Sequence, residues 1–298
     1  QDIDTEIAAI PSRINEIAKE IADLNASIRL AEIQGGSSND LRDKRDRLID
    51  ELSEFTDVRA IEQKDGTYTV IIGSIVVVDR ETSEELRVET TISEDRNIRK
   101  TLLRSRDGSD YSPERGKLGA LIRFRDAVIG GILEKLDNFT SEIVKTVNFE
   151  HRNGFGLDGL TGRNFFDPGH TKAYNISLSE DIVDVTHIAA SGSGSRGDNS
   201  NALALNEVRR QKVVLGQFTI SEYYNALIAD IGIMAREAKS GRVNEELLVN
   251  QIDNAREGIK GVSIDEELIR MIQTQHIYQG ASRVIVTIDA LLQTLISM

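Results

Sequence analysis

The sequence contains no cysteine, no tryptophan and three prolines, and aromatic residues make up 5% of its 298 residues. Without cysteine, a disulfide framework and a thiolate metal site are excluded. Charged residues account for 29% of the chain, and many charges with few aromatic residues are typical of long helices rather than of a compact, aromatic-cored enzyme. We therefore expect a mainly helical protein.

The sequence also lacks a long apolar run and an excess of positive charge. Its longest apolar stretch, residues 70–78, has nine residues that include Gly73 and Ser74, whereas a helix that crosses a bilayer needs roughly twenty. The net charge is −13, and phosphate binding depends on clustered lysine and arginine. We expect no membrane insertion and no nucleic-acid partner.

The residue patterns of common catalytic sites are missing. The four histidines are scattered, and there is neither a Gly-x-Ser-x-Gly elbow nor a phosphate loop that ends in Lys-Ser or Lys-Thr. Pairs of acidic residues occur, but they lie at helix starts and on solvated faces. We therefore expect no enzymatic activity, no cofactor and no metal site.

One glycine-rich segment leaves two alternatives open. Residues 192–197 fit the dinucleotide-binding pattern G-x-G-x-x-G, but further helices follow where such a site needs a second strand, so a flexible loop is favoured over an NAD-dependent oxidoreductase. Arg196-Gly197-Asp198 is an integrin-type tripeptide. The alternative function is therefore an extracellular coiled-coil binding module or adhesin that presents either residues 58–113 or this loop, and its binding would depend on Asp198.

The clearest periodicity lies at the start of the chain, where apolar residues alternate in steps of four and three, as in a coiled-coil seam. Pro11 lies inside this row and predicts a kink or a new helix start, because proline removes a helical hydrogen bond. Residues 35–39 then break the pattern, and Asn39 or Asp40 can cap a second helix, which predicts a helical hairpin or a jogged rod. The internal seam consists of Ile3, Ile7, Ile10, Ile14, Ile17, Ile21, Leu24 and Ile28.

After residue 57 the period becomes strand-like, with many β-branched residues. Asp65-Gly66 and Gly73-Ser74 are placed as two-residue hairpin turns between three of the segments. We expect a small antiparallel β region, with strands at 58–62, 67–72, 75–79, 86–92 and 98–103.

Helical spacing returns at residue 118 and continues to about 151, and the residues that follow are rich in Gly, Asn and Asp. Short strands are expected at 174–177 and 182–188, and helices at 201–214, 219–238 and 244–259; Thr219 and Glu222 form a capping box. The fold class is mainly α with a small antiparallel β region, in an elongated helical bundle or rod. Its five parts are the N-terminal helices 1–57, the β region 58–113, a long helix 114–152, a loop-rich segment 153–200 and the C-terminal helices 201–298.

The terminal helix, 263–298, carries an apolar surface too wide for one neighbouring helix to cover. A capping box in Ser263 and Glu266 predicts where the helix begins. Apolar residues recur at coiled-coil spacing, and a further row lies beside them from Ile277 onward, so this end needs partners on two sides. The residues expected to make these contacts are Tyr278, Ala281, Val284, Ile285, Ile288, Leu291, Leu292 and Leu295.

Short stretches spread in order over most of the chain also carry a family resemblance. They are 21–25, 39–48, 65–68, 121–126, 154–159, 165–166, 197–205, 261–267 and 275–282. Together they resemble the flagellar hook-associated protein 1 family, which forms the junction between the bacterial hook and filament. Two features depart from the family: Gly280 stands where alanine is usual, and residues 167–199 leave little room for the outer domain of larger members.

The resemblance implies a structural, non-enzymatic component of the flagellum that joins hook to filament and is needed for motility. It implies export through the flagellar type III apparatus without a cleaved signal peptide, and a final location outside the cell. The implied partners are further copies of the chain in a ring, the hook protein, the second junction protein, and a cytoplasmic export chaperone on the C-terminal helix. The family pairs its two terminal helices, so we expect residues before Gln1. The terminal helix alone would also fit another flagellar axial or junction protein.

Overall fold

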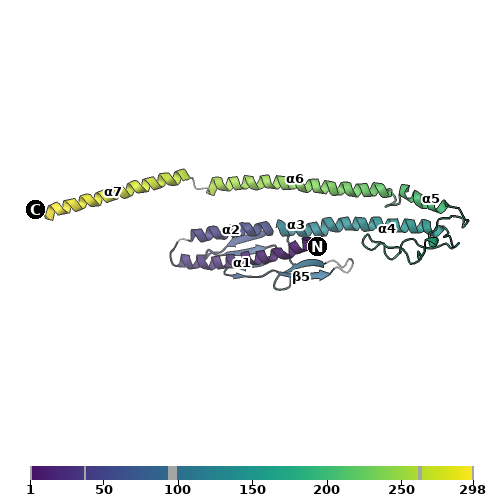
Figure 1. Ribbon diagram of the computed structural model, residues 1–298. Coiled ribbons are helices and arrows are strands. Elements are labelled where there is room, and N and C mark those ends of the chain that lie inside the picture. Colours follow the sequence, from purple (N-terminus) through teal and green to yellow (C-terminus); the bar gives the residue numbers. More distant parts are fainter. Residues whose placement is uncertain (1, 37, 93–98, 261–263, 297–298) are drawn as a thin grey trace. The chain divides into compact units, whose positions relative to one another are not determined.

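The computed structural model describes residues 2–36, 38–92, 99–260 and 264–296 (Figure 1). The chain divides into two compact units, Gln1–Leu227 and Ile228–Met298. Long helices dominate, and short antiparallel strands lie in the first unit. This confirms the predicted fold class, mainly α with a small antiparallel β region. The five-part division of the sequence stays a prediction.

The first unit begins with a helical hairpin of α1 (Asp2–Ile33) and α2 (Asn39–Phe55). Ion pairs show that the two helices are antiparallel: Arg13 Nη2 lies 2.6 Å from Glu51 Oε1, and Arg42 Nη2 lies 2.6 Å from Glu32 Oε1 near the turn. The predicted hairpin is therefore confirmed.

Two details of this hairpin differ from expectation. The helix α1 runs without a new start through Pro11, which is itself buried; packing of its apolar neighbours offsets the hydrogen bond that proline removes. The N-cap of α2 is Ser38, and neither Asn39 nor Asp40 takes that place. The Ser38 hydroxyl donates to Glu32 Oε1 at 2.6 Å, so it ties the end of α1 to the start of α2.

The strands form two antiparallel sheets instead of one. The larger has the order β1-β2-β3-β4, and the smaller pairs β5 with β6. Gly66 and Gly73 lie in the predicted turns, in the left-handed region at φ +75° and +54°. The Gly73-Ser74 turn has two residues, as predicted, because Ile72 pairs with Ile75. The first turn is longer than predicted, because Gln63 N donates to the Thr67 carbonyl at 2.8 Å and residues 64–66 lie between them. The strands are β1 (Val58–Glu62), β2 (Tyr68–Ile72), β3 (Ile75–Asp79), β4 (Thr82–Ser83), β5 (Arg87–Ile92) and β6 (Arg99–Arg104).

The two sheets separate at Leu86. Its backbone N–H donates to Asn15 Oδ1 at 2.8 Å, and its carbonyl accepts from Asn15 Nδ2 at 3.0 Å. A side chain of α1 therefore takes the place of a neighbouring strand at this position. The short strand β4 was not predicted, because two residues are too few to show a period.

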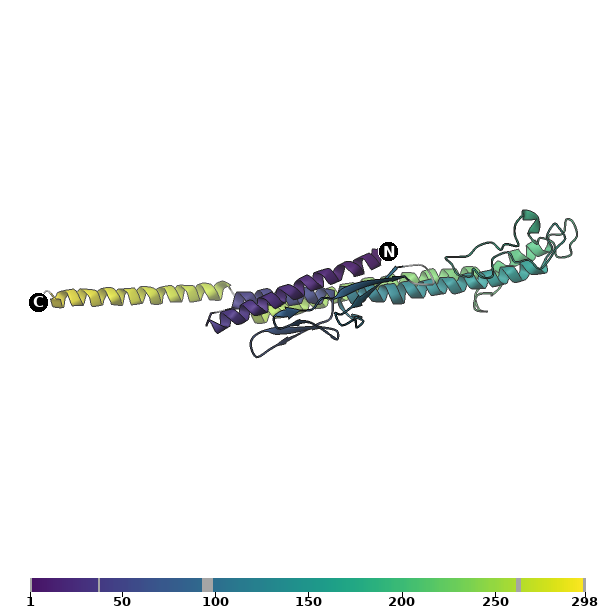
Figure 2. The same ribbon diagram turned by 90° about the horizontal axis from the view of Figure 1, so that it is seen from below.

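The core of the first unit lies between the helical hairpin and the strands, which run along α1 (Figure 2). It contains a fully buried arginine, Arg45. Arg45 Nη1 donates to Asn25 Oδ1 at 2.9 Å and to the Gly66 carbonyl at 2.8 Å, and its guanidinium lies 3.6 Å above the ring of Tyr68. These contacts fix the β1–β2 turn to both helices.

Residues 116–153 form one helical stretch, close to the predicted 118–151, but its middle is a π-helix. The parts are α3 (Gly116–Arg123), the π segment Phe124–Ile129 and α4 (Gly130–Asn153). Arg125, in the π segment, donates from Nη1 to Asp4 Oδ1 at 2.8 Å and to the Thr101 carbonyl at 2.9 Å. The wider turn lies where this helix is tied to α1 and β6.

The loop-rich segment after α4 lacks the two predicted strands, at 174–177 and 182–188. Residues 185–187 form a 3-10 turn, and the pairing in this segment is limited to isolated bridges such as Phe166 with Leu178. The β-branched residues here have no adjacent strand to complete a ladder, and the backbone is held instead by side chains.

The C-terminal helices are α5 (Ser200–Glu207), α6 (Ile220–Lys260) and α7 (Ile264–Ile296). The predicted helix 201–214 ends early, in a 3-10 turn at residues 208–210. The helices predicted at 219–238 and 244–259 are one helix, because a glycine such as Gly241 costs only about 1 kcal/mol in a helix.

Both predicted capping boxes concern the starts of these helices. In the first, Thr219 N donates to Glu222 Oε2 at 2.9 Å and Glu222 N donates to Thr219 Oγ1 at 3.2 Å, which confirms the prediction. The second, at Ser263, lies outside the described residues.

Candidate functional site

The N-terminal seam is covered by its own unit. Seven of its side chains are buried: Ile7, Ile10, Ile14, Ile17, Ile21, Leu24 and Ile28. Ile3 is partly buried against the same core. The residues that cover this row belong to α2, the strands and α3. The row therefore stabilises the fold of the first unit.

The apolar rows of α7 are exposed. Of the eight residues expected to make contacts, seven have side chains between 51% and 77% exposed, and Ala281 is exposed as well. Residues 277–296 contain only two charged side chains, Arg283 and Asp289. We call the eight residues the terminal apolar surface; they are Tyr278, Ala281, Val284, Ile285, Ile288, Leu291, Leu292 and Leu295. Large exposed apolar surfaces often mark sites of contact with proteins or membranes, and the contact role of these eight residues stays a prediction.

Further exposed apolar side chains lie on α6 and were not among the predicted contact residues. Large apolar side chains of this helix are about half exposed, including Ile228, Ile233, Leu247, Leu248 and Ile252. Helical spacing alone does not separate apolar side chains that face a core from those that face solvent.

Three buried polar side chains position the segment between α4 and α5. His151 Nδ1 lies 2.9 Å from the Arg163 carbonyl, and His151 Nε2 accepts from Ala189 N at 2.9 Å. Asn148 Oδ1 accepts from the backbone N–H groups of Phe165 and Phe166, and Asn201 Nδ2 donates to the Ala189 carbonyl at 2.6 Å. The segment thus has a defined shape without regular strands.

The glycine-rich loop, residues 192–197, wraps around the carboxylate of Asp198. One oxygen of that carboxylate accepts from Ser191 Oγ at 2.9 Å, Gly192 N at 3.0 Å and Ser193 N at 2.9 Å, and the other accepts from Ser200 N at 2.9 Å. Hydrogen bonds from Ser200 and Ser193 hold the pKa of Asp198 well below its usual range. These N–H groups serve the chain's own side chain, so the geometry favours neither a dinucleotide nor an adhesive role for Asp198.

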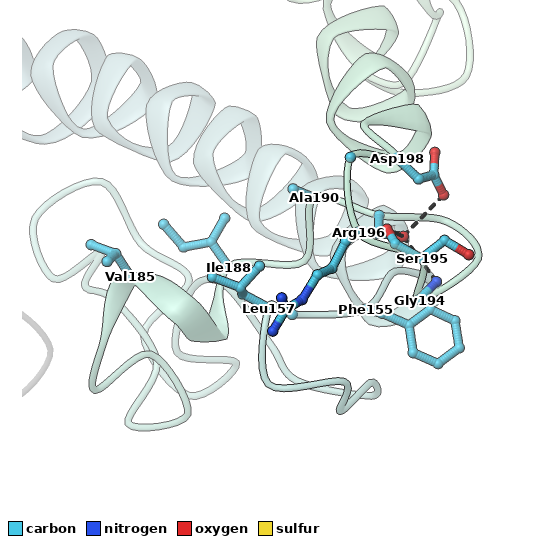
Figure 3. A pocket seen from close by; sticks show the side chains of 12 residues that line it. Phe155, Leu157, Val185, Ile188, Ala190, Gly194, Ser195, Arg196 and Asp198 are labelled. Atoms are coloured by element: carbon cyan, nitrogen blue, oxygen red, sulfur yellow. Dashed lines mark hydrogen bonds between the residues drawn. The ribbon is translucent and has the colours of Figure 1, made fainter.

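Beside this loop is a cavity of about 390 Å³ (Figure 3). Its wall is largely apolar and includes Phe155, Leu157 and Ile188. Figure 3 shows the Arg196 side chain extending along the cavity towards Leu157, while the Asp198 carboxylate turns away. The cavity therefore offers apolar surface and one positive charge.

Neither a metal site nor a membrane span is found in the part of the chain that the structure describes. Within the described ranges, no group of three or more His, Cys, Asp or Glu residues could hold a metal ion. Over the same residues, no helix combines the length and the apolar composition that crossing a membrane requires.

Two family profiles match the chain. "Flagellar hook-associated protein FlgK helical domain" matches residues 1–166, and "Flagellar basal body rod FlgEFG protein C-terminal" matches residues 259–298. The first covers more than half of the chain and ends at Phe166. The second includes the whole terminal apolar surface.

Curated relatives agree with these profiles. Flagellar hook-associated protein 1 of Bacillus subtilis is 29% identical over 324 aligned positions, which cover 95% of this chain and 63% of the relative. The proteins of the same name from Salmonella typhimurium and Escherichia coli are each 22% identical and match 100% of this chain and 72% of their own length. The chain thus spans less than two thirds of the Bacillus protein.

Among solved structures, the flagellar hook junction protein FlgK from Burkholderia pseudomallei is similar to part of the chain. The match has 24% sequence identity and a TM-score of 0.48, and it covers 56% of this chain and 31% of that protein.

Proposed function

The chain belongs to the family of the flagellar hook-associated protein FlgK, and from this membership we propose that it is a non-enzymatic structural component that joins the flagellar hook to the filament. The helical-domain match over residues 1–166 supports the hook-associated role more specifically than the rod-type C-terminal match does. One observation carries the proposed mechanism: the terminal apolar surface on α7 is exposed in the single chain.

Assembly through this surface follows from the hydrophobic effect. Burial of apolar area contributes roughly 25 cal/mol per Å², and two rows at coiled-coil spacing direct that burial to neighbouring helices. We propose that the partners are other copies of the chain in a homopolymeric ring, together with the hook protein and the second junction protein. The first unit, whose core is complete, would then form the rigid part of each subunit.

The same surface needs protection before assembly. An exposed apolar helix is an aggregation hazard inside the cell. We propose that a cytoplasmic export chaperone covers α7, and that the chain leaves through the flagellar type III apparatus without a cleaved signal peptide. Its final location would then be the flagellum, outside the cell.

A complementation experiment tests this function. Cells that lack the full-length protein should form hooks without filaments, and the unaltered protein should restore filaments and motility. Ile285→Asp and Leu292→Asp should each fail to restore them, because a charge cannot be buried in an apolar helix interface. Gln293→Asp is the matched control, since Gln293 is an exposed polar residue of the same helix, and it should restore motility.

Two results would contradict the proposal. Filaments on hooks in cells without the protein would show that it is not the junction component. Normal filaments with Ile285→Asp would show that assembly uses a surface other than α7. Near-ultraviolet circular dichroism of the variants checks that the first unit remains folded.

A further inference from the structure

The cavity beside the glycine-rich loop is held open by backbone hydrogen bonds. Phe155 N donates to the Ser191 carbonyl at 2.7 Å, Ser191 N returns a bond to the Phe155 carbonyl at 3.2 Å, and Leu157 N donates to the Thr186 carbonyl at 2.7 Å. The buried His151 fixes the same segment through Ala189. A site held in this way exists before a ligand arrives, which lowers the entropy cost of binding.

The chemistry of the cavity selects one class of ligand. Its aliphatic wall is open to solvent, with Leu157 73% exposed. Asp198 is occupied by the loop, and the guanidinium of Arg196 forms no ion pair with any described residue. An aliphatic side chain beside a free carboxylate would fill the wall and form a charge-assisted hydrogen bond to Arg196.

The chain itself carries such a group on an exposed bend, residues 180–184. Val183 is 83% exposed, the highest value among the large apolar side chains described in the first unit, and Glu180 and Asp184 beside it are also exposed. Val183 does not line the cavity of its own copy. Val185, the residue directly after the bend, does line it, so the bend and the cavity are neighbouring surfaces made of different residues.

We propose that the cavity binds the 180–184 bend of a second copy of the chain, with Val183 against Leu157 and Ile188, and Glu180 paired with Arg196. Because the two surfaces differ, the contact is head-to-tail, and such contacts close into a ring when the rotation between copies allows it. The inference rests on the proposed function, in which copies stand side by side in a ring.

The proposed contact has a low affinity between free chains and becomes persistent only when the chains are held together in an assembly. A five-residue bend buries far less than the area of about 1,000 Å² that a stable interface needs. In a ring, the other contacts between copies would raise the local concentration of bends around cavities, and this would make the contact persistent. The bend would therefore set the angle between neighbouring copies and contribute little to the affinity between them.

Cysteine cross-linking tests the contact directly, because the chain has no cysteine of its own. One sample of the chain carries Val183→Cys, and a second sample, with a different tag, carries Leu157→Cys. The two are mixed and mildly oxidised, and the mixed disulfide dimer is quantified. A matched control pairs Val183→Cys with Ile33→Cys, because Ile33 is as exposed as Leu157 but lies at the end of α1. We expect about tenfold more mixed dimer than in the control, because each weak encounter that places the two cysteines together can be trapped as a disulfide.

Reversing the charges of Arg196 and Glu180 tests whether the cross-link depends on the proposed ion pair. Adding Arg196→Glu to the Leu157→Cys chain should reduce the mixed dimer to the control level, and adding Glu180→Arg to the Val183→Cys chain should restore it. A yield equal to the control, or one that Arg196→Glu does not change, would overturn the proposal.

A second measurement separates this inference from the proposed function. Isolated flagella from cells that carry full-length Val183→Cys are labelled with a maleimide dye. Dye at the hook–filament junction, with no Val183–Leu157 cross-link in flagella of the double variant, would overturn only the contact. Absence of the protein from the junction, with normal cross-linking of the purified chains, would overturn the proposed function.

Discussion

Two apolar rows with the same spacing have opposite surroundings in this chain. On α1, Ile17 is completely buried, whereas on α7 Ile285 is 67% exposed. Both rows advance in steps of three and four residues, so each would pack well against a helix or a sheet. The row on α1 has α2 and the strands as its partners, while the row on α7 is open. Spacing identifies an apolar face, but the rest of the chain decides whether its partner is internal.

The polar residues near the two rows also differ in whether they bond to other segments of the chain or only to their own helix. On α1, the side chains of Asn15 and Asn25 bond to the backbone of Leu86 and Tyr68 in the β region. On α7, the hydroxyl groups of Thr274 and Thr287 donate to carbonyls of their own helix, those of Arg270 and Arg283. The first row is specified for one partner by directional bonds. The hydroxyl groups of α7 are used within its own helix, which agrees with the proposal that this surface meets first a chaperone and then a subunit.

The largest expected effect comes from placing a charge in the buried row. Ile17→Asp should lower the free energy of unfolding of the first unit by about 4 kcal/mol, because it removes a buried side chain and buries a carboxylate. Urea unfolding followed by circular dichroism measures this. Ile285→Asp should change the stability of the single chain by less than about 0.5 kcal/mol, as surface substitutions do.

Ile33→Asp is the matched control within α1, because Ile33 is exposed near the end of the helix. It should resemble Ile285→Asp in the unfolding experiment. Equal destabilisation by Ile17→Asp and Ile285→Asp would show that α7 also has an internal partner, and the contrast between the two rows would then be wrong.

Secondary structure was predicted correctly from the sequence wherever one hydrophobic period continued for several residues. The hairpin of α1 and α2, the turns at Gly66 and Gly73, and most strands follow from alternation and from glycine positions. Prediction failed at 174–177 and 182–188, where β-branched residues suggested strands. A strand exists only with a neighbour to complete its hydrogen bonds, and local composition does not report whether that neighbour is present.

Polar contacts between distant segments were also outside the reach of sequence reasoning. Arg45 lies in a run of charged residues that reads as a solvated face, yet it is fully buried. Its partners, Asn25 and Gly66, are far away in the sequence. For the candidate site, spacing did identify the apolar residues of α7. It gave no sign of the cavity, which depends on three loop segments coming together.

The next largest effect on the stability of the first unit should come from substitution of Arg45. Arg45→Ala should lower the stability of the first unit by about 3 kcal/mol, because the Gly66 carbonyl would lose its buried donor and the ring of Tyr68 its cation. Arg45→Met should cost less than alanine, since an apolar side chain of similar length fills the space. Urea midpoints measure both variants.

Arg47→Ala is the control for this pair, because Arg47 is exposed two residues further along α2. It should lie within about 0.5 kcal/mol of the unaltered chain. A stability loss from Arg47→Ala as large as that from Arg45→Ala would mean that the charge of α2, and not the buried contact, stabilises the first unit.

A smaller effect is expected at Asp4, and it depends on pH. Partial burial raises the pKa of this carboxyl, but hydrogen bonds from Thr101 and Arg125 outweigh burial and leave the pKa below its usual value. A lowered pKa in the folded state gives stability that is complete above about pH 4, the ordinary value for Asp, and is lost as the pH falls through the lowered one. Asp4→Asn should therefore cost about 1 kcal/mol at neutral pH.

The difference between Asp4→Asn and the unaltered chain should shrink as the pH falls below about 4. Urea midpoints at several pH values measure it. Asp2→Asn is the matched control, since Asp2 is exposed on the same turn of α1. A difference that stays constant from neutral to acid pH would show that the carboxylate charge of Asp4 is not what ties α1 to β6.

The smallest effect, and the most direct probe of the open row, is expected at Gly280 in α7. An added Cβ there meets no atom within 4 Å in the single chain, and the same holds for Gly241 in α6. Each change to alanine should therefore stabilise its helix by about 1 kcal/mol, measured as a rise in helix content on mild heating. The number of filaments formed with each variant shows whether a neighbouring subunit comes close to Gly280. If a neighbouring backbone approaches α7 at Gly280, Gly280→Ala reduces filament number while Gly241→Ala does not; if both support normal filaments, the neighbours contact α7 through its larger side chains, and the terminal apolar surface is sufficient without a close approach at the glycine.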